Sequence, residues 1–162
     1  MTDNRKIIRI FLIIFIVVTI CRENDWLSLS YYKSQANSAQ SQSFNDFSMG
    51  NAESLKDVPL TVQCMGYEYG GKGNVNHSAV RVDVLDISYG ALWVPLFKHT
   101  RFDVSVPVSI QRNGHNITGT VIINGTLSIN GFCSRRDAKH ILANLIMQRA
   151  YNTIRTYMDN IQ

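Results

Sequence analysis

The sequence predicts an α+β fold, with a four- to five-stranded antiparallel sheet packed against a long C-terminal helix, behind an N-terminal membrane anchor. Three observations predict it. A nearly pure aliphatic run follows Arg5, Lys6 and Arg9. Alternating apolar and polar residues flank Asn113-Gly114, as in a β-hairpin. The last 25 or so residues contain no proline or glycine and repeat apolar side chains at helical spacing. The chain of 162 residues is long enough for one domain with one core.

The first 30 residues are expected to export the rest of the chain. A basic stretch before an apolar run is shared by secretory signal peptides and uncleaved signal anchors. The run from Ile7 to Cys21 is interrupted by Arg9 and is shorter than the roughly 17–25 residues of a comfortable membrane span. No small-residue cleavage site follows it closely, so we expect an uncleaved anchor. A cleaved signal peptide and a lipoprotein modified at Cys21 are the alternatives.

Composition divides the remaining chain into two parts. Residues 31–56 are rich in Ser, Gln and Asn and carry few apolar side chains. Such a segment buries too little apolar surface to offset the entropy of ordering it, so we expect a polar tether. Residues 57–162 are expected to form a single exported α+β domain.

The clearest element is a hairpin centred on Asn113-Gly114. Both residues of a type I′ turn need positive φ, which Asn and Gly tolerate. A two-residue loop pairs apolar residues with apolar residues or glycine throughout, which supports the register. The expected pairs are Ile110 with Ile117, Val108 with Gly119, Val106 with Val121 and Val104 with Ile123.

A second Asn-Gly pair predicts another turn at residues 124–126. A three-residue or bulged loop there keeps Leu127 and Ile129 on the core face. Upstream, residues 59–69 and 79–88 are predicted strands around a glycine-rich loop. The apolar residues of the second strand change face near Val84, which indicates a bulge or two covered faces. Residues 89–97 contain Pro95 and are expected to form an edge strand or loop.

A C-terminal helix is predicted to begin after Ser134. This residue is a natural N-cap, and Asp137 occupies the acidic position of a capping box. The apolar stripe is expected to cover the sheet. It comprises Ala138, Ile141, Leu142, Leu145, Ile146, Ala150, Ile154, Tyr157 and Ile161.

Cys64 and Cys133 are expected to form a disulfide. Exported domains commonly carry such bridges, and this one would close a loop of roughly 70 residues. The sequence has no C-x-x-C spacing and no evident activating group for either thiol, so a catalytic cysteine is disfavoured.

The sequence shows no recognisable catalytic, metal or cofactor motif. Its four histidines lack metal-ligand spacing, and His115 is interpreted only as part of the hairpin tip. We therefore expect a protein that is not an enzyme. The competing hypothesis is an exported enzyme acting on the cell wall, or an inhibitor of one, using carboxylates such as Asp83, Asp86 and Asp103.

Two groups of residues are candidate binding residues. The first is Trp93 and Phe97, followed by Lys98 and Arg101, which suits a partner protein or an anionic surface. The alternative is that the two aromatic side chains fill the core from an edge strand.

The second group is Arg135, Arg136 and Lys139 in the first turns of the predicted helix. Cations there oppose the helix dipole, at a cost of a few tenths of a kcal/mol or more per charge. Basic residues at an unfavourable position of a helix can indicate a binding function. The ordinary interpretation is that they form a solvated basic face.

From Pro59 onward the chain has ten Lys and Arg against six Asp and Glu. This modest excess, together with export, argues against a nucleic-acid partner. The sequence therefore favours an inner-membrane protein with its domain in the periplasm, binding a partner of a transport, secretion or immunity system. A secreted or periplasmic product after signal cleavage is the alternative location. A viral or eukaryotic type II glycoprotein is a further alternative, because sequons stand at Asn76, Asn116 and Asn124.

Overall fold

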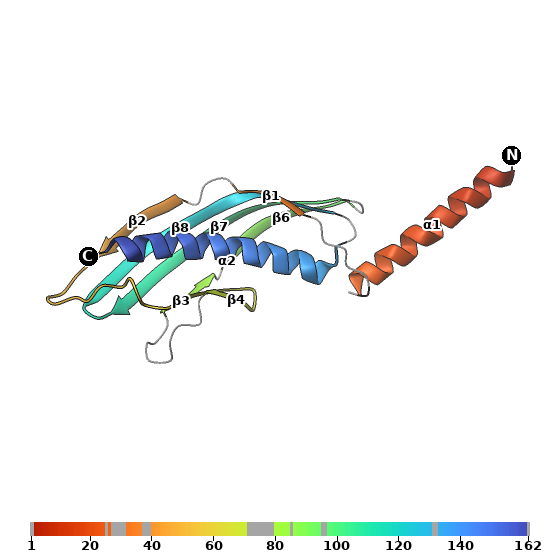
Figure 1. Cartoon of the computed structure of the whole chain (residues 1–162). Coiled ribbons are helices and arrows are strands. Elements are labelled where there is room, and N and C mark those ends of the chain that lie inside the picture. Colours follow the sequence, from red (N-terminus) through yellow and green to blue (C-terminus); the bar gives the residue numbers. More distant parts are fainter. Residues whose placement is uncertain are drawn as a thin grey trace.

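The computed structural model describes residues 2–24, 26, 32–36, 40–70, 80–84, 86–94, 97–130 and 133–161, and it confirms the α+β class. Figure 1 shows a sheet region with one helix lying along it and a second helix projecting from one end. The elements are α1 (Thr2–Glu23), β1 (Tyr32–Ala36), β2 (Gln40–Asp46), β3 (Leu60–Cys64), β4 (Tyr67–Gly70), β5 (Val80–Val84), β6 (Asp86–Val94), β7 (Phe97–Arg112), β8 (His115–Asn130) and α2 (Arg135–Asn160).

The predicted hairpin is confirmed and forms the centre of the larger sheet. Strands β7 and β8 are each 16 residues long and pair in the expected register, including Ile110 with Ile117 and Val104 with Ile123. The turn residues Asn113 and Gly114 have φ values of 48° and 82°. Both values are positive, as a type I′ turn requires.

The predicted turn at residues 124–126 is wrong, because β8 continues through it to Asn130. An unbroken strand keeps Ile123, Leu127 and Ile129 on one face by simple alternation, and all three are buried. Gly125 lies on the same face, directly opposite the buried Phe102. Gly125 is therefore an interior residue of a paired strand and not part of a turn.

The predicted tether is also wrong over much of its length. Strands β1 and β2 pair antiparallel with successive parts of β8 and extend the larger sheet to the order β1-β8-β7-β6, with β2 also on β8. The register of β2 shifts between Gln42 and Asn45, and Phe44 in this irregularity packs against the core. Leu55 is fully buried. Polar residues suffice along an outer strand because backbone hydrogen bonds hold it and one aromatic side chain anchors it.

A second sheet has the order β4-β3-β5, in which β3 and β5 run parallel. The chain leaves this sheet after Val84 and enters the larger sheet at Asp86, which pairs with Ser105. The predicted irregularity near Val84 therefore marks a change of sheet. Strand β6 lies at the edge of the larger sheet, as Pro95 indicated.

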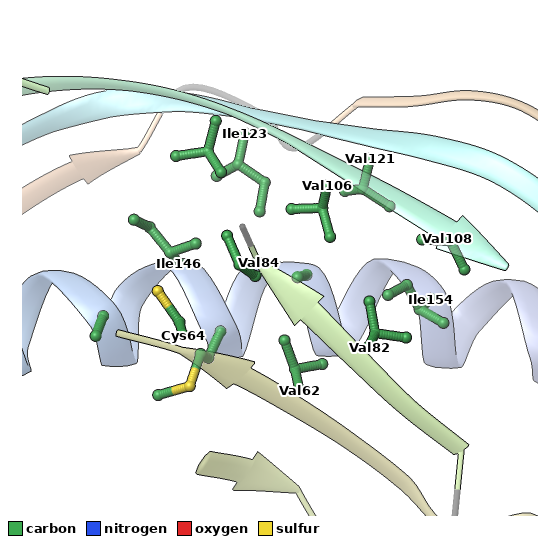
Figure 2. Packing of buried hydrophobic residues seen from close by; sticks show 14 of the residues in the cluster. Val62, Cys64, Val82, Val84, Val106, Val108, Val121, Ile123, Ile146 and Ile154 are labelled. Carbon is green, nitrogen blue, oxygen red and sulfur yellow. The ribbon is translucent and has the colours of Figure 1, made fainter. Parts of the chain in front are cut away.

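Helix α2 begins and packs largely as predicted. The Ser134 hydroxyl accepts a hydrogen bond from the Asp137 backbone N–H at 3.0 Å. Figure 2 shows side chains from both sheets and from α2 meeting in one core. Because α2 contacts β3 and β4 as well as β8, its buried surface is wider than one stripe and includes Ala143, Met147 and Met158.

Helix α1 projects from the domain in Figure 1, and its large apolar side chains are exposed. Phe11, for example, is 69% exposed. Among the described residues, no helix combines the length and apolarity needed to cross a membrane. The membrane anchor therefore stays a prediction.

Candidate functional site: the basic end of the domain

One end of the domain lies close to α1 because the connection is short. Strand β1 begins at Tyr32, opposite Ile129 near the end of β8. Eight residues separate Glu23, the last of α1, from Tyr32, so the two lie at most about 30 Å apart. Helix α2 starts five residues after β8 ends, and Figure 1 shows its first turn at this same end of the domain.

The structure brings the backbones of both predicted binding groups to this end. Strands β6 and β7 meet there, with Val94 paired to Phe97. Phe97 pairs in turn with Asn130, the last residue of β8 before the chain enters α2. The side chains of Trp93, Phe97 and Lys98 lie outside what the structure describes, so the choice between a surface and a core role for the aromatic pair stays open.

Arg135, Arg136 and Lys139 form the described part of this site, which we call the basic end. All three side chains are exposed. The described acid among them is Asp137, which is partly buried and whose backbone is held by the Ser134 cap. The His140 ring lies against the Tyr67 ring of β4 in a tilted arrangement, with ring centroids 4.6 Å apart, so this part of α2 contacts the smaller sheet.

Arg101 does not join the basic end. Its side chain is exposed, while that of its neighbour Phe102 is buried in the core beside α2. Successive side chains of a strand point to opposite faces, so Arg101 lies on the outer face of the sheet, away from α2.

The predicted disulfide is not present, since Cys64 and Cys133 are both buried thiols. Each side chain fills part of the core, as a small apolar residue would. Burial raises the pKa of the Cys64 thiol to about 11. Beside it is a shallow hollow of about 230 Å³ that Glu68 and Asp83 also line. Neighbouring carboxylates do not stabilise a thiolate, so Cys64 stays in its protonated, unreactive thiol form.

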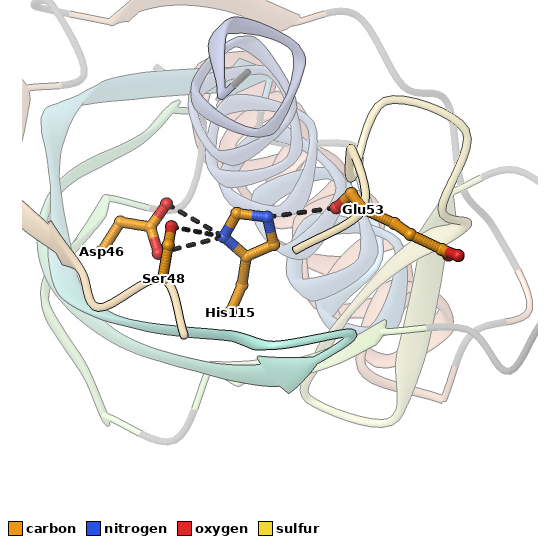
Figure 3. A network of polar contacts seen from close by, with 4 residues as sticks. All are labelled: Asp46, Ser48, Glu53 and His115. Carbon is orange, nitrogen blue, oxygen red and sulfur yellow. Dashed lines mark hydrogen bonds and ion pairs between the residues drawn. The ribbon is translucent and has the colours of Figure 1, made fainter. Parts of the chain in front are cut away.

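Sequence reasoning missed a polar cluster around His115, which is only 3% exposed. Figure 3 shows its ring between Asp46 and the chain at Glu53. The Nδ1 atom lies 3.1 Å from both carboxylate oxygens of Asp46 and 3.2 Å from the Ser48 hydroxyl. The Nε2 atom lies 3.1 Å from the backbone carbonyl of Glu53. The sequence contained a sign of this burial. Side chains alternate between the two faces of a strand, so His115 lies on the same, core-facing side of β8 as Ile117.

This cluster holds the chain together and is not arranged as a catalytic triad. In a triad one imidazole nitrogen faces the carboxylate and the other faces the nucleophile. Here Ser48 and Asp46 share Nδ1, while a carbonyl occupies Nε2. The Asp46 carboxylate lies at one ring nitrogen and the Glu53 carbonyl at the other, so an acceptor faces each nitrogen. The cluster fixes residues 46–53 on the hairpin tip, together with a hydrogen bond from the Met49 N–H to the Gly114 carbonyl at 2.7 Å.

The other candidate groups are dispersed. Asp83 and Asp103 are exposed on different sheets, and the Asp86 side chain lies outside what the structure describes. Within the described ranges, no three His, Cys, Asp or Glu side chains gather to hold a metal ion. Of the sequons, Asn124 is exposed and the Asn116 side-chain oxygen is buried, while Asn76 falls among the residues not described.

Comparison with protein-family models, with curated proteins and with solved structures finds no match to this chain.

Proposed function

We propose that this chain is an exported protein that α1 holds at the inner membrane, and that its α+β domain binds a partner in the periplasm without catalysing a reaction. The observation that carries the proposal is the surface of α1. A helix that is apolar all round is unstable in water and requires an apolar environment. Exposed apolar side chains occur on every side of α1 and comprise Ile7, Ile8, Ile10, Phe11, Leu12, Ile13, Ile14, Phe15, Ile16, Val17 and Ile20.

The flanks of α1 suit a short anchor. Arg9 lies near its N-terminal end, where a long basic side chain can extend to the head groups. Trp26 lies just beyond its C-terminal end and is 76% exposed. Tryptophan favours the membrane interface, so these residues would mark the two boundaries of a thin or locally compressed span.

A binding role is supported by the contacts of the described polar groups. The buried His115 and its partners fix one end of the fold. The Cys64 thiol is buried with a raised pKa. In the basic end, the Arg136 and Lys139 side chains are exposed, at the end of the domain that lies close to α1.

Carbonate extraction of membranes tests the attachment. The full chain with a C-terminal tag is expected to stay in the bacterial membrane fraction at its full-length mass. A variant with Leu12→Glu and Phe15→Glu, which places charges in the apolar run, should become extractable. A matched variant with Leu12→Val and Phe15→Leu should behave as the wild type. Equal extraction of all three proteins would contradict attachment through α1.

Crosslinking in cells tests the binding surface. The double variant Trp93→Ala, Phe97→Ala should lose the crosslinked partner if these aromatic side chains form the surface. Unchanged crosslinking and localisation of this double variant would remove the two aromatic side chains from the proposal.

One observation favours a second candidate, a type II glycoprotein. The sequon at Asn124 is exposed on the outer face of the sheet, whereas the Asn116 side-chain oxygen is buried. In a eukaryotic host, enzymatic deglycosylation should then shift the mass of the wild type and of Asn116→Gln. It should shift Asn124→Gln less. Identical masses before and after treatment would remove this candidate.

A further inference from the structure

We propose that the basic end, Arg135, Arg136 and Lys139, contacts anionic phospholipid head groups of the same membrane that holds α1. The inference rests on the proposed function, because it requires α1 in the bilayer. It names the ligand of the basic end as the phosphate-bearing surface beside the anchor.

The first step is reach. The chain between Glu23 and Tyr32 extends at most about 30 Å, and Tyr32 lies at the end of the domain from which α2 starts. The hairpin tip at Asn113 lies at the other end of the 16-residue strands β7 and β8. With α1 inserted, the basic end is therefore the part of the domain held closest to the bilayer.

The second step is charge. Attraction to an anionic surface falls off within about 8 Å at physiological ionic strength, so only groups held against the surface benefit. Arg136 and Lys139 are exposed, so their side chains are free of the core and can touch a surface that meets this end of the domain. Asp137 places one negative charge among the three cations of the basic end, which leaves the basic end a formal charge of +2.

The third step concerns the choice of ligand. Cations in the first turns of α2 lower its stability by opposing the helix dipole, and nearby phosphates reverse that effect. A short tether presents the bilayer at high effective concentration, whereas an acidic protein must be recruited by further contacts. The interfacial position expected for Trp26 continues the same surface.

The test uses the full chain and vesicles of phosphatidylcholine alone or mixed 7:3 with phosphatidylglycerol. Wild type should float with both kinds of vesicle through α1. The anchor variant Leu12→Glu, Phe15→Glu should float only with the anionic vesicles, and high salt should release it. In that background, Arg136→Gln with Lys139→Gln should lower partitioning about 25-fold, at about fivefold per charge.

Lys56→Gln with Arg81→Gln is the matched control, because both side chains are exposed and neither lies in the basic end. This pair should lower partitioning by less than twofold. An equal effect of the two pairs would overturn the inference, and so would an unchanged partition in the Arg136, Lys139 variant. Failure of the wild type to float with neutral vesicles would instead contradict the proposed attachment through α1.

Discussion

Replacing Phe44 with alanine measures whether the polar segment before β3 belongs to the folded domain. Phe44 is half-buried, and its ring lies against Gly119 of β8. It also stacks on Tyr157 of α2, with ring centroids 4.4 Å apart and planes 27° apart. Truncating a fully buried phenylalanine costs roughly 3–5 kcal/mol, and an aromatic pair contributes roughly 0.5–1.5 kcal/mol beyond burial. Partial burial lowers the sum, so we expect a loss of about 2–3 kcal/mol.

Urea unfolding followed by far-ultraviolet circular dichroism gives this free energy directly. Phe47→Ala is the matched control, because Phe47 lies in the same segment and is 58% exposed. It should cost less than about 0.5 kcal/mol. A double-mutant cycle of Phe44→Ala and Tyr157→Ala should show coupling of about 1 kcal/mol. Equal, negligible losses for Phe44→Ala and Phe47→Ala would mean that residues 40–46 are a tether after all.

Three further changes test other parts of the structure. His115→Ala leaves the Asp46 carboxylate and the Glu53 carbonyl without their His115 partner, so it should cost about 3 kcal/mol. His140→Ala, at an exposed position, should cost under about 1 kcal/mol. Similar losses of unfolding free energy in urea would contradict the His115 cluster. Gly119→Ala places a methyl group against the Phe44 ring and should cost about 1–3 kcal/mol of unfolding free energy. The cost should be smaller in a protein that already carries Phe44→Ala. If the losses of the two single variants simply add in the double variant, this contact would be contradicted. The pKa of the Cys64 thiol is raised by burial, so the folded state keeps this proton while the unfolded thiol loses it near pH 9. The free energy of unfolding should therefore fall as pH rises from about 9 to 11, and it should fall more steeply than in Cys64→Ala. Parallel plots of unfolding free energy against pH for the two proteins would contradict the burial of Cys64.

Features encoded locally could be predicted from the sequence. The β7–β8 register followed from Asn113-Gly114 because turn chemistry and apolar alternation agree on one pairing. The start of α2 followed from Ser134 because an N-cap depends on a few neighbouring residues. At Asn124-Gly125 the same turn signal misled, since pairing with a 16-residue partner strand overrides a local turn preference.

Features that depend on distant partners were missed. Strands β1 and β2 carry polar sequence and are held by backbone pairing to β8, which composition does not reveal. The role of His115 depends on Asp46, a residue 69 positions away in the chain. The disulfide was expected from the compartment, yet both thiols are accommodated as core side chains.

The basic end could be predicted only in part, because some of its features are local in sequence and others depend on distant strand pairing. Arg135, Arg136 and Lys139 stood out because they oppose the dipole of their own helix, which is a local conflict. That they lie at the end of the domain next to α1 depends on the pairing of β1 with β8. Arg101 was grouped with Trp93 by sequence proximity, but strand alternation places it on the outer face.

The central claim is that α1 holds an exported domain at the membrane, and protease treatment of intact spheroplasts tests it most directly. The full chain carries a C-terminal tag and is followed by immunoblot, with a cytoplasmic protein as the integrity control. We predict a membrane-bound band of full-length mass whose tag is lost on adding protease outside, while the cytoplasmic control survives. A tag protected until the spheroplasts are lysed, or a shorter product free in the soluble fraction, would contradict the claim.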